Sequence, residues 1–485
     1  MSLEAAAAQV NRARLSTRCP IALTGYLFLI SYVAGATAAA LHALLTKPDP
    51  RSVVSWAALC WLFPIGGALL YGLFGINRLD THAPTPEPVL ASAARAQAEV
   101  AAGLESAQLV ALAGAGATLT GLPLLGGNEL ELLSNAQVAF PRMLRAIARA
   151  TRSVHLATYI FQSDAVGRQF IDALASAAAR GVRVRVLVDG IGEWYDWPHV
   201  VPLLRRAGVT TARFLPPRLV PPSLSLNCRN HRKLLLVDGT ECFLGGMNLG
   251  GRETGGSTGL RMTDTDFALR GPAVAQLGAV FAADWKFASG ESLPEDAPPA
   301  HAGSMACRAV TGGPDESLDK LLLLISTAIA GAERQILIMT PYFIPPPELV
   351  TALQGAALRG LDVSVIIPLH SNLGYIDWAT LHWLPALVSR GVHVYRTPAP
   401  FSHAKLFVVD RRYANVGSAN LDTRSLRLNF EITLEVFDPR LCGDLAAFIE
   451  HFRSRAMPVT VSDLQRESAL VRLRNSLCWL VSPYL

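Results

Sequence analysis

A ten-residue pattern occurs twice in this chain, with its two histidines 172 residues apart: NHRKLLLVDG at 230–239 and SHAKLFVVDR at 402–411. In each copy an asparagine follows 17 residues after the histidine, at the end of a GGMN or GSAN turn. Because both the residue types and their spacings are kept, the repeat predicts two half-sites of one active site. The candidate residues are His231, Lys233, Asp238, Gly246 and Asn248 in the first copy, and His403, Lys405, Asp410, Ser418 and Asn420 in the second.

The order of side chains within the pattern indicates an anionic substrate. If each copy is a β-strand, its His and Lys share one face and its Asp points to the other. An imidazole can attack or transfer protons, and an ammonium group can bind an oxygen of the same anion. Asp238 and Asp410 belong to the motif, but we expect them to fix the local backbone. The GGMN and GSAN turns would add backbone N–H groups and an Asn amide near the anion.

A reactive histidine needs its second ring nitrogen held, usually by a carboxylate or a carbonyl. Two acidic residues downstream of the motifs are candidates: Glu431 in LNFEITLEVFD and Asp264 in TDTDFALRG. The alternative for each is a solvated residue on a strand. A lone His beside a Lys is a poor set of metal ligands, and the seven cysteines are scattered without CxxC spacing. We therefore expect neither a metal nor another cofactor.

The charge of the chain also favours an anionic partner. Its formal net charge is +5, which fits lipid headgroups or nucleic acid. Of 43 Lys and Arg residues only five are Lys, and two of those five lie in the repeated motif. The sequence has no aromatic and basic stretch suited to stacking on single strands, so we expect no nucleic-acid partner. The oligomeric state does not follow from the sequence.

The N-terminal part predicts a membrane anchor. The chain is 51% hydrophobic, and two uncharged apolar runs cover 21–45 and 53–76. Each run is long enough to cross a hydrocarbon core of about 30 Å as a helix. We expect a transmembrane helical hairpin within residues 1–80, bent at Pro64, with both ends in the cytoplasm. A cleaved signal peptide is the alternative, but the first run exceeds the usual apolar length of about 7–15 residues.

The rest of the chain predicts an α/β fold that is built twice. Residues 81–127 are rich in Ala, Pro and Gly and are expected to form a linker, in which the Ala-rich stretch 92–112 could be helical. Beyond them, helical and strand patterns alternate in the same order in two segments, 128–300 and 301–485. For example, a helical pattern that ends at Gly181 precedes VRVRVLVDG, and one that ends at Gly360 precedes LDVSVIIP.

The duplicated HxKxxxxD motif resembles the phospholipase D superfamily. Longer stretches, including NCRNHRKLLLVDG, TPYFIP and NVGSANLDTRSLRLNFE, resemble bacterial cardiolipin synthases of the phospholipase D type. The resemblance covers almost the whole chain. It implies two tandem phospholipase D-like α/β repeats that form one active site, in a multi-pass protein of the bacterial inner membrane.

The resemblance also implies a mechanism. His231 would attack a phosphatidylglycerol phosphorus and form a phosphatidyl-histidine, and His403 would protonate the leaving glycerol and then activate a second phosphatidylglycerol. Phosphatidylglycerol and other anionic phospholipids would be the partners, and no metal would be required. By the same resemblance, Glu431 and Asp264 orient the histidines, and the phosphate oxygens are held by Lys233, Lys405, Asn248 and Asn420.

Two departures from the family pattern bear on the choice of lipid. Ala157 stands where many members have Glu, and Asp266 stands where many have His. Neither change removes a residue of the two-step mechanism. Two alternatives to the synthase remain: a hydrolase of the same chemistry that releases phosphatidic acid, and an inactive membrane protein that binds lipid. The intact His, Lys and Asn sets argue against the second.

Overall fold

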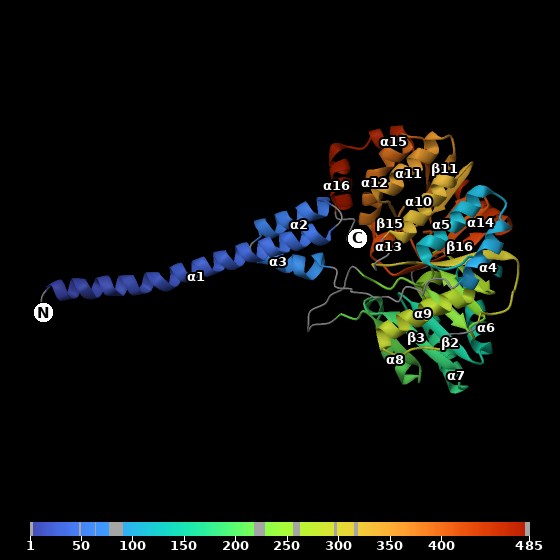
Figure 1. The fold of residues 1–485 in the computed structure, drawn as a ribbon, viewed down its shortest axis with the longest axis horizontal. Helices are drawn as coiled ribbons and strands as arrows, with labels where there is room; N and C mark the ends of the chain where they lie inside the picture. The colour runs from blue at the N-terminus through green and yellow to red at the C-terminus, as the bar shows by residue number, and fades with distance from the viewer. Residues whose placement is uncertain are drawn as a thin grey trace. The chain divides into compact units, whose positions relative to one another are not determined.

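The computed structural model describes residues 3–47, 50–63, 65–76, 91–217, 228–255, 262–294, 298–314 and 319–480. The chain divides into two compact units, which Figure 1 draws as one ribbon. The first consists of Met1–Asp80 and Pro217–Ser225. The second consists of Thr81–Pro216 and Leu226–Leu485 and contains both motif copies.

The first unit contains one helix that is long and apolar enough to cross a membrane, as judged on the described residues. This helix is the part Thr24–Thr46 of α1, which spans Leu3–Thr46 and includes the first expected run. The second expected run is not one continuous helix. It is divided into α2 (Pro50–Leu62), α3 (Gly66–Leu70) and a π-helical turn η1 (Tyr71–Gly75). The prediction of two full-length spans is therefore not supported.

Local geometry explains where the second run breaks. Ile65, which precedes α3, has φ 62°, a left-handed conformation that a β-branched residue rarely adopts inside a helix. Pro64, the expected bend, lies outside the described residues. Within this unit, Tyr71 is buried together with Ala43 and Cys60, and its hydroxyl lies 2.7 Å from His42 Nδ1. The chain after α1 thus packs against α1.

The second unit is built on one sheet, which has fifteen strands among the described residues. The order is β17-β12-β11-β9-β13-β14-β16-β8-β1-β7-β6-β5-β2-β3-β4. The strands β8 (Met305–Gly312) and β1 (Leu125–Ser134) pair antiparallel near its middle. On one side of them lie β2 (Ser153–Thr158), β3 (Arg183–Asp189), β4 (Thr210–Phe214), β5 (Leu234–Val237), β6 (Glu241–Gly245) and β7 (Thr265–Arg270).

The other side of the sheet has the same succession of pairings. There β16 pairs with β14, β14 with β13, and β13 with β9, all antiparallel, as β7, β6, β5 and β2 do on the first side. The mixed α/β class expected from the sequence is confirmed. The strands are β9 (Gln335–Met339), β11 (Asp362–Pro368), β12 (His393–Thr397), β13 (Leu406–Val409), β14 (Tyr413–Gly417), β16 (Glu431–Phe437) and β17 (Met457–Pro458).

Helices bury one face each against this sheet. In α7 (Ala165–Ala179), Phe170 and Leu174 enter the core, and the N-cap Asp164 accepts hydrogen bonds from two backbone N–H groups. Buried apolar clusters form on both sides of the sheet's middle: one uses residues 133–268, and another joins residues 101–124 to residues 306–464. The other main helices are α6 (Ala136–Arg149), α8 (Val200–Arg206), α9 (Ala273–Ser289), α10 (Lys320–Gly331), α11 (Pro347–Leu358), α12 (Gly374–Val388), α14 (Pro439–Arg453), α15 (Val461–Gln465) and α16 (Ala469–Leu480).

The segment expected as a linker, 81–127, contains two helices, α4 (Ala91–Ala102) and α5 (Ala107–Thr120). Helix α5 is part of the core, because Ala113 is completely buried. The backbone carbonyl of Ala113 accepts a hydrogen bond of 2.8 Å from Arg308, whose guanidinium also pairs with Glu435. The first ten residues of the segment lie outside the described residues.

Candidate active site

Each motif copy begins before its strand. The strands β5 and β13 start at Leu234 and Leu406, so the reactive histidine and lysine of each copy lie in the preceding connection. This corrects the expectation that the whole motif is a strand. The reason is that the backbone of each histidine is bonded to the other half of the chain and not to a neighbouring strand. His231 N donates to Phe430 O at 2.9 Å, and His403 N donates to Thr263 O at 2.6 Å.

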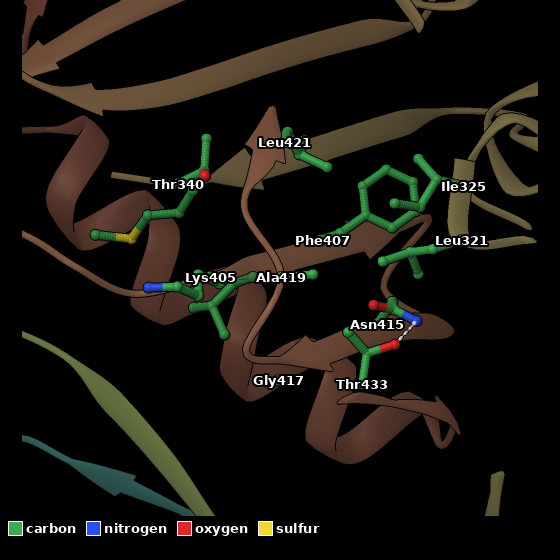
Figure 2. A pocket seen from close by; sticks show the side chains of 12 residues that line it. Leu321, Ile325, Thr340, Lys405, Phe407, Asn415, Gly417, Ala419, Leu421 and Thr433 are labelled. Atoms are coloured by element: carbon green, nitrogen blue, oxygen red, sulfur yellow. Dashed lines mark hydrogen bonds between the residues drawn. The ribbon is translucent and has the colours of Figure 1, made fainter. Parts of the chain in front are cut away.

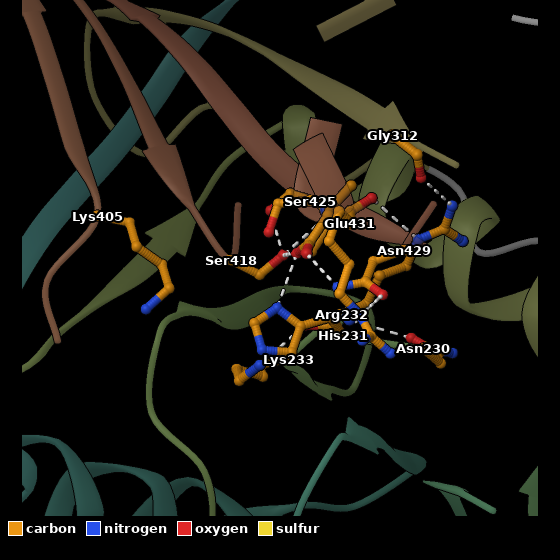
Figure 3. Close-up of polar contacts among 12 residues, drawn as sticks. Asn230, His231, Arg232, Lys233, Gly312, Lys405, Ser418, Ser425, Asn429 and Glu431 are labelled. Carbon is orange, nitrogen blue, oxygen red and sulfur yellow. Dashed lines mark hydrogen bonds and ion pairs between the residues drawn. The ribbon is translucent and has the colours of Figure 1, made fainter. Parts of the chain in front are cut away.

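These backbone contacts bring the carboxylates of one half to the histidine of the other. His231 Nδ1 lies 3.0 Å from Glu431 Oε2. Figure 3 shows that Ser418 and Asn429 surround the same carboxylate. Ser418 Oγ donates to Oε2 at 2.5 Å, and Asn429 Nδ2 donates to Oε1 at 3.3 Å. Glu431 is fully buried. Its carboxylate holds Nδ1 of His231, and the other ring nitrogen, Nε2, is not bonded to this carboxylate.

The second histidine is held in the same way from the first half. His403 Nδ1 lies 2.7 Å from Asp264 Oδ2, and Asp264 Oδ1 accepts a hydrogen bond of 2.7 Å from Thr265 N. Gly246 is required next to this carboxylate, because a Cβ at that position would lie 2.5 Å from Asp264 Oδ1. Both residues expected to orient the histidines thus contact one, each across the two halves of the chain.

The two lysines lie close to the histidines but make different contacts. Lys233 Nζ donates to the carbonyl of His231 at 2.9 Å and lies 5.8 Å from the centre of the Tyr159 ring. Lys405 Nζ donates to the carbonyl of His403 at 2.6 Å and lies 3.1 and 3.2 Å from its two ring nitrogens. Each lysine also contributes to the electrostatic field at His231. The four side chains therefore form one centre.

Burial lowers the basicity of this centre. Desolvation lowers the pKa of Lys233 to about 7. Desolvation and the neighbouring Lys405 lower the pKa of His403 to about 4. Burial also lowers the pKa of His231, although Glu431 opposes that shift. In the centre without substrate both imidazoles are therefore neutral at pH 7, as a nucleophile or a proton acceptor must be.

The asparagines that follow the motifs differ in their pairing. Asn248 accepts a hydrogen bond from Ile160 N at 3.3 Å, and its own backbone N–H donates to Glu253 at 3.1 Å. Asn420 is buried, and its Oδ1 has no hydrogen-bond partner in the described part of the chain. Buried amide oxygens are normally paired, so Asn420 can accept a bond from a bound molecule.

The motif aspartates hold the backbone and do not contact the histidines. Asp238, at φ 52°, accepts from the backbone N–H groups of residues 151–153 at the start of β2. Asp410, at φ 51°, accepts from the N–H groups of residues 333–335 at the start of β9, at 2.8 Å each. They join the end of one strand to the start of its neighbour, which fits the expectation that they fix the local backbone.

The sequence did not single out several residues that support this centre. Arg232 lies between the halves: its guanidinium pairs with Asp284 at 2.5 Å and donates to Glu431 O at 3.1 Å. Glu253 lies five residues after Asn248 and is buried. The motif spacing contains no signal for either residue, because the second copy has Ala404 and Ser425 at the matching positions.

A small hollow lies beside this centre (Figure 2). Lys405 is one of its walls, but most of the other walls are apolar and neither histidine lines it. We therefore assign no reaction to it. In the part of the chain that the structure describes, no group of three or more His, Cys, Asp or Glu side chains is arranged to hold a metal ion.

Comparisons with known proteins agree with this geometry. The family described as "Cardiolipin synthase, PLD-like domain" matches residues 143–285 and 325–453, more than half of the chain. The crystal structure of a phosphatidylserine synthase from Haemophilus influenzae has a similar fold. Its TM-score is 0.59 at 16% identity, over 77% of this chain and 100% of that chain. The fold and the paired histidines thus define the phospholipase D-like class.

Curated relatives narrow the assignment within this class. A cardiolipin synthase of Geobacillus kaustophilus is 32% identical over 92% of this chain and 91% of its own length. Cardiolipin synthase A of Pseudomonas aeruginosa is 33% identical, over 92% of this chain and 93% of its own length. The chain belongs to the family of cardiolipin synthases with a phospholipase D-like domain, which confirms the resemblance found in the sequence.

Proposed function

We propose that this protein is a membrane-bound phosphatidyltransferase that makes cardiolipin and glycerol from two phosphatidylglycerol molecules. The observation that carries the proposal is the crossed pairing of the histidines. Each Nδ1 is bound to a carboxylate of the other half, which leaves two Nε2 atoms to act in one centre that also holds both lysines. A nucleophile and an acid/base of this kind suit transfer at phosphorus.

In the first step, His231 Nε2 attacks the phosphorus of phosphatidylglycerol. A P–N bond forms, the P–O bond to the headgroup glycerol breaks, and protonated His403 gives its proton to the leaving glycerol oxygen. Glu431 supports this step, because a carboxylate at Nδ1 stabilises the positive charge that develops on the imidazole. The product is a phosphatidyl-histidine.

In the second step, His403 takes the proton from a primary hydroxyl of a second phosphatidylglycerol. That oxygen attacks the phosphorus, the P–N bond breaks, and cardiolipin leaves with His231 neutral again. Asp264 would stabilise the protonated form of His403 in both steps. Water in place of the second lipid would give phosphatidic acid by the same path, so the chemistry of the protein does not by itself exclude hydrolysis.

The phosphate would lie between Lys233 and Lys405, with the amides of Asn248 and Asn420 on its oxygens. Its negative charge opposes the effect of the lysines on His403 and raises the pKa of that imidazole from about 4. Substrate binding would thus supply the protonated His403 that the first step requires.

The wider organisation fits this function. We infer that residues 128–300 and 301–485 are two phospholipase D-like repeats, supported by the matching strand pairings on the two sides of the sheet. We also infer that residues 1–80 anchor the enzyme in the bacterial inner membrane. There α1 spans the bilayer, the bent segment after it turns back against α1, and the catalytic unit faces the cytoplasm.

Incubation of the purified, detergent-solubilised protein with phosphatidylglycerol, labelled in the acyl chains or in the headgroup, tests this proposal. We expect cardiolipin and free glycerol in equal amounts. Phosphatidic acid without cardiolipin would make the protein a hydrolase. If no product forms from any of several anionic and zwitterionic phospholipids, the protein is a lipid-binding protein and the proposal is wrong.

A further inference from the structure

Glu253 is a buried carboxyl group with one unused oxygen beside the reactive centre. Its side chain belongs to a residue that is only 3% exposed. Oε1 accepts hydrogen bonds from the backbone N–H and the side-chain amide of Asn248, at 3.1 and 3.5 Å. Oε2 has no hydrogen-bond partner among the described residues. Because an unpaired buried polar atom costs folding free energy, this oxygen requires an explanation.

The turn that carries Glu253 is held firmly by the neighbouring helix. In the turn η3 (Gly251–Thr254), Gly251 N donates a hydrogen bond of 2.6 Å to Oδ2 of Asp164, the N-cap of α7. The next backbone N–H, of Arg252, donates to Gln162 Oε1 at 3.2 Å. These bonds fix the backbone of the turn that carries Glu253, and Oε2 itself is shielded from solvent.

The charges around Glu253 come from both halves of the site. When Glu253 is ionised, its negative charge raises the pKa of both Lys233 and Lys405. Burial and the nearby Asp264 raise the pKa of Glu253 to about 8, so the group is mainly neutral at pH 7. A neutral carboxyl group does not repel a phosphate, and it can both donate and accept a hydrogen bond.

The second half has no carboxyl group at the position that matches Glu253. Counting five residues from each asparagine, Glu253 in the first half corresponds to Ser425 in the second, where the backbone N–H is bonded to Asp422. The reaction itself needs equivalent histidines, lysines and asparagines in both halves. The second half has its own buried carboxyl group near Lys405, Asp422, which caps the short helix Thr423–Arg427 by accepting a hydrogen bond from Ser425 N. The position of Glu253 therefore differs between the halves, and such a difference suits a task that distinguishes the two sides, such as binding a headgroup.

We propose that Glu253 Oε2 binds a hydroxyl group of the polyol that enters or leaves the site, the glycerol headgroup of the lipid. An ammonium headgroup is disfavoured, because Lys233 and Lys405 already supply positive charge there. A hydroxyl group carries no charge and can both donate and accept, as the carboxyl group can. This inference rests on the proposed transfer reaction and names the residue that selects its alcohol.

An acceptor competition tests the inference. The enzyme receives unlabelled phosphatidylglycerol and, in separate reactions at equal concentration, radiolabelled glycerol, propane-1,2-diol or 1-propanol, and the label that enters the lipid is measured. The variants are Glu253→Met, which keeps the length of the side chain without its oxygens, and the conservative Glu253→Gln. The matched control is Arg252→Gln, which changes the exposed side chain next to Glu253 on the same turn.

We expect wild type and Arg252→Gln to prefer glycerol over 1-propanol. Glu253→Met should lower that preference by about tenfold, and Glu253→Gln should lower it less, because one hydrogen bond to a hydroxyl is lost or weakened. The ratio does not depend on the folded fraction of each preparation, and Glu253→Gln provides a second variant if Glu253→Met does not fold. An unchanged ratio in both variants, with all acceptors used equally less, would overturn the inference. If wild type incorporates no alcohol at all, the proposed transfer reaction itself fails.

Discussion

His231 and His403 have the same local backbone path but different surroundings. Glu431 holds Nδ1 of His231 at 3.0 Å and is itself bonded by a serine and an asparagine. Asp264 holds Nδ1 of His403 at 2.7 Å and receives its own backbone bond from Thr265. Lys405 Nζ lies within 3.2 Å of both ring nitrogens of His403, whereas Lys233 Nζ donates to the carbonyl of His231 and lies over the Tyr159 ring.

The difference gives a physical basis for the two distinct roles that we propose for the histidines. The carboxylate beside His231 is the more strongly fixed, which suits an imidazole that becomes positively charged when it bonds to phosphorus. The ammonium group beside His403 keeps that imidazole neutral until a phosphate arrives, which suits a group that transfers protons. The roles therefore depend on neighbours that the motif does not contain.

The largest effect is expected from removing either histidine. Because both belong to one centre, His231→Ala and His403→Ala should each lower cardiolipin formation by at least about 10⁴-fold, and the double variant should be little worse. Rates measured with labelled phosphatidylglycerol check this. Two independent sites would instead leave each single variant with about half of the activity.

The carboxylates should have the next largest effect, on different steps. Glu431→Gln and Asp264→Asn should each lower the rate by about 10² to 10⁴, since each holds one histidine. With a phosphatidyl-p-nitrophenol donor, whose leaving group needs no proton, formation of the phosphatidyl-enzyme should recover in Asp264→Asn but not in Glu431→Gln. Equal recovery in both variants would show that the two histidines do not have separate roles.

The pH dependence should reflect the buried lysine. Burial lowers the pKa of Lys233 from 10.5 to about 7, so its positive charge is present below pH 7 and is lost above it. We expect kcat/KM, which reports the free enzyme, to fall by roughly tenfold per pH unit above neutrality. In Lys286→Gln, which changes an exposed lysine, the profile should match wild type. A flat profile between pH 7 and 9 would contradict the assignment.

The smallest effect on the reaction is expected from the motif aspartates, which should act on stability. Asp238→Ala and Asp410→Ala each leave three backbone N–H groups without their partner, and each should lower the free energy of unfolding by about 1–3 kcal/mol.

Burial raises the pKa of Asp238, but the backbone hydrogen bonds outweigh it and lower the pKa below 3.8. Its contribution is therefore present above about pH 4 and is lost as the pH falls further. Thermal unfolding at pH 7 and pH 3 measures this difference. A rate loss as large as that of the histidine variants, at unchanged stability, would show that the aspartates take part in the reaction.

The repeat made much of the site predictable. Because His231 and His403 share their spacing to a lysine and an asparagine, the sequence predicted which residue types would lie together. The partner of each histidine did not follow from that spacing, since Glu431 and Asp264 lie 200 and 139 residues away from the histidines they hold. That pairing depends on how the two halves of the sheet meet, which no local pattern reports.

The fold shows the same limit. Alternating helix and strand patterns predicted an α/β fold, but composition misrepresented two segments. Ala-rich α5 reads as a linker, although Arg308 and Glu435 fix it in the core. The apolar run 53–76 has the length of one helix, but its hydropathy does not reveal the change of direction near Ile65. The unused oxygen of Glu253 likewise becomes visible only when burial is known.

The central claim is that both halves build one centre in which His231 is the nucleophile. The most direct measurement is to quench wild type, His231→Ala and His403→Ala during reaction with the acyl-labelled p-nitrophenol donor and to map the labelled peptide by mass spectrometry. We expect a phosphatidyl group on His231 in wild type, its accumulation on His231 in His403→Ala, and no labelled histidine in His231→Ala. Label on His403 in the His231→Ala protein would contradict the claim.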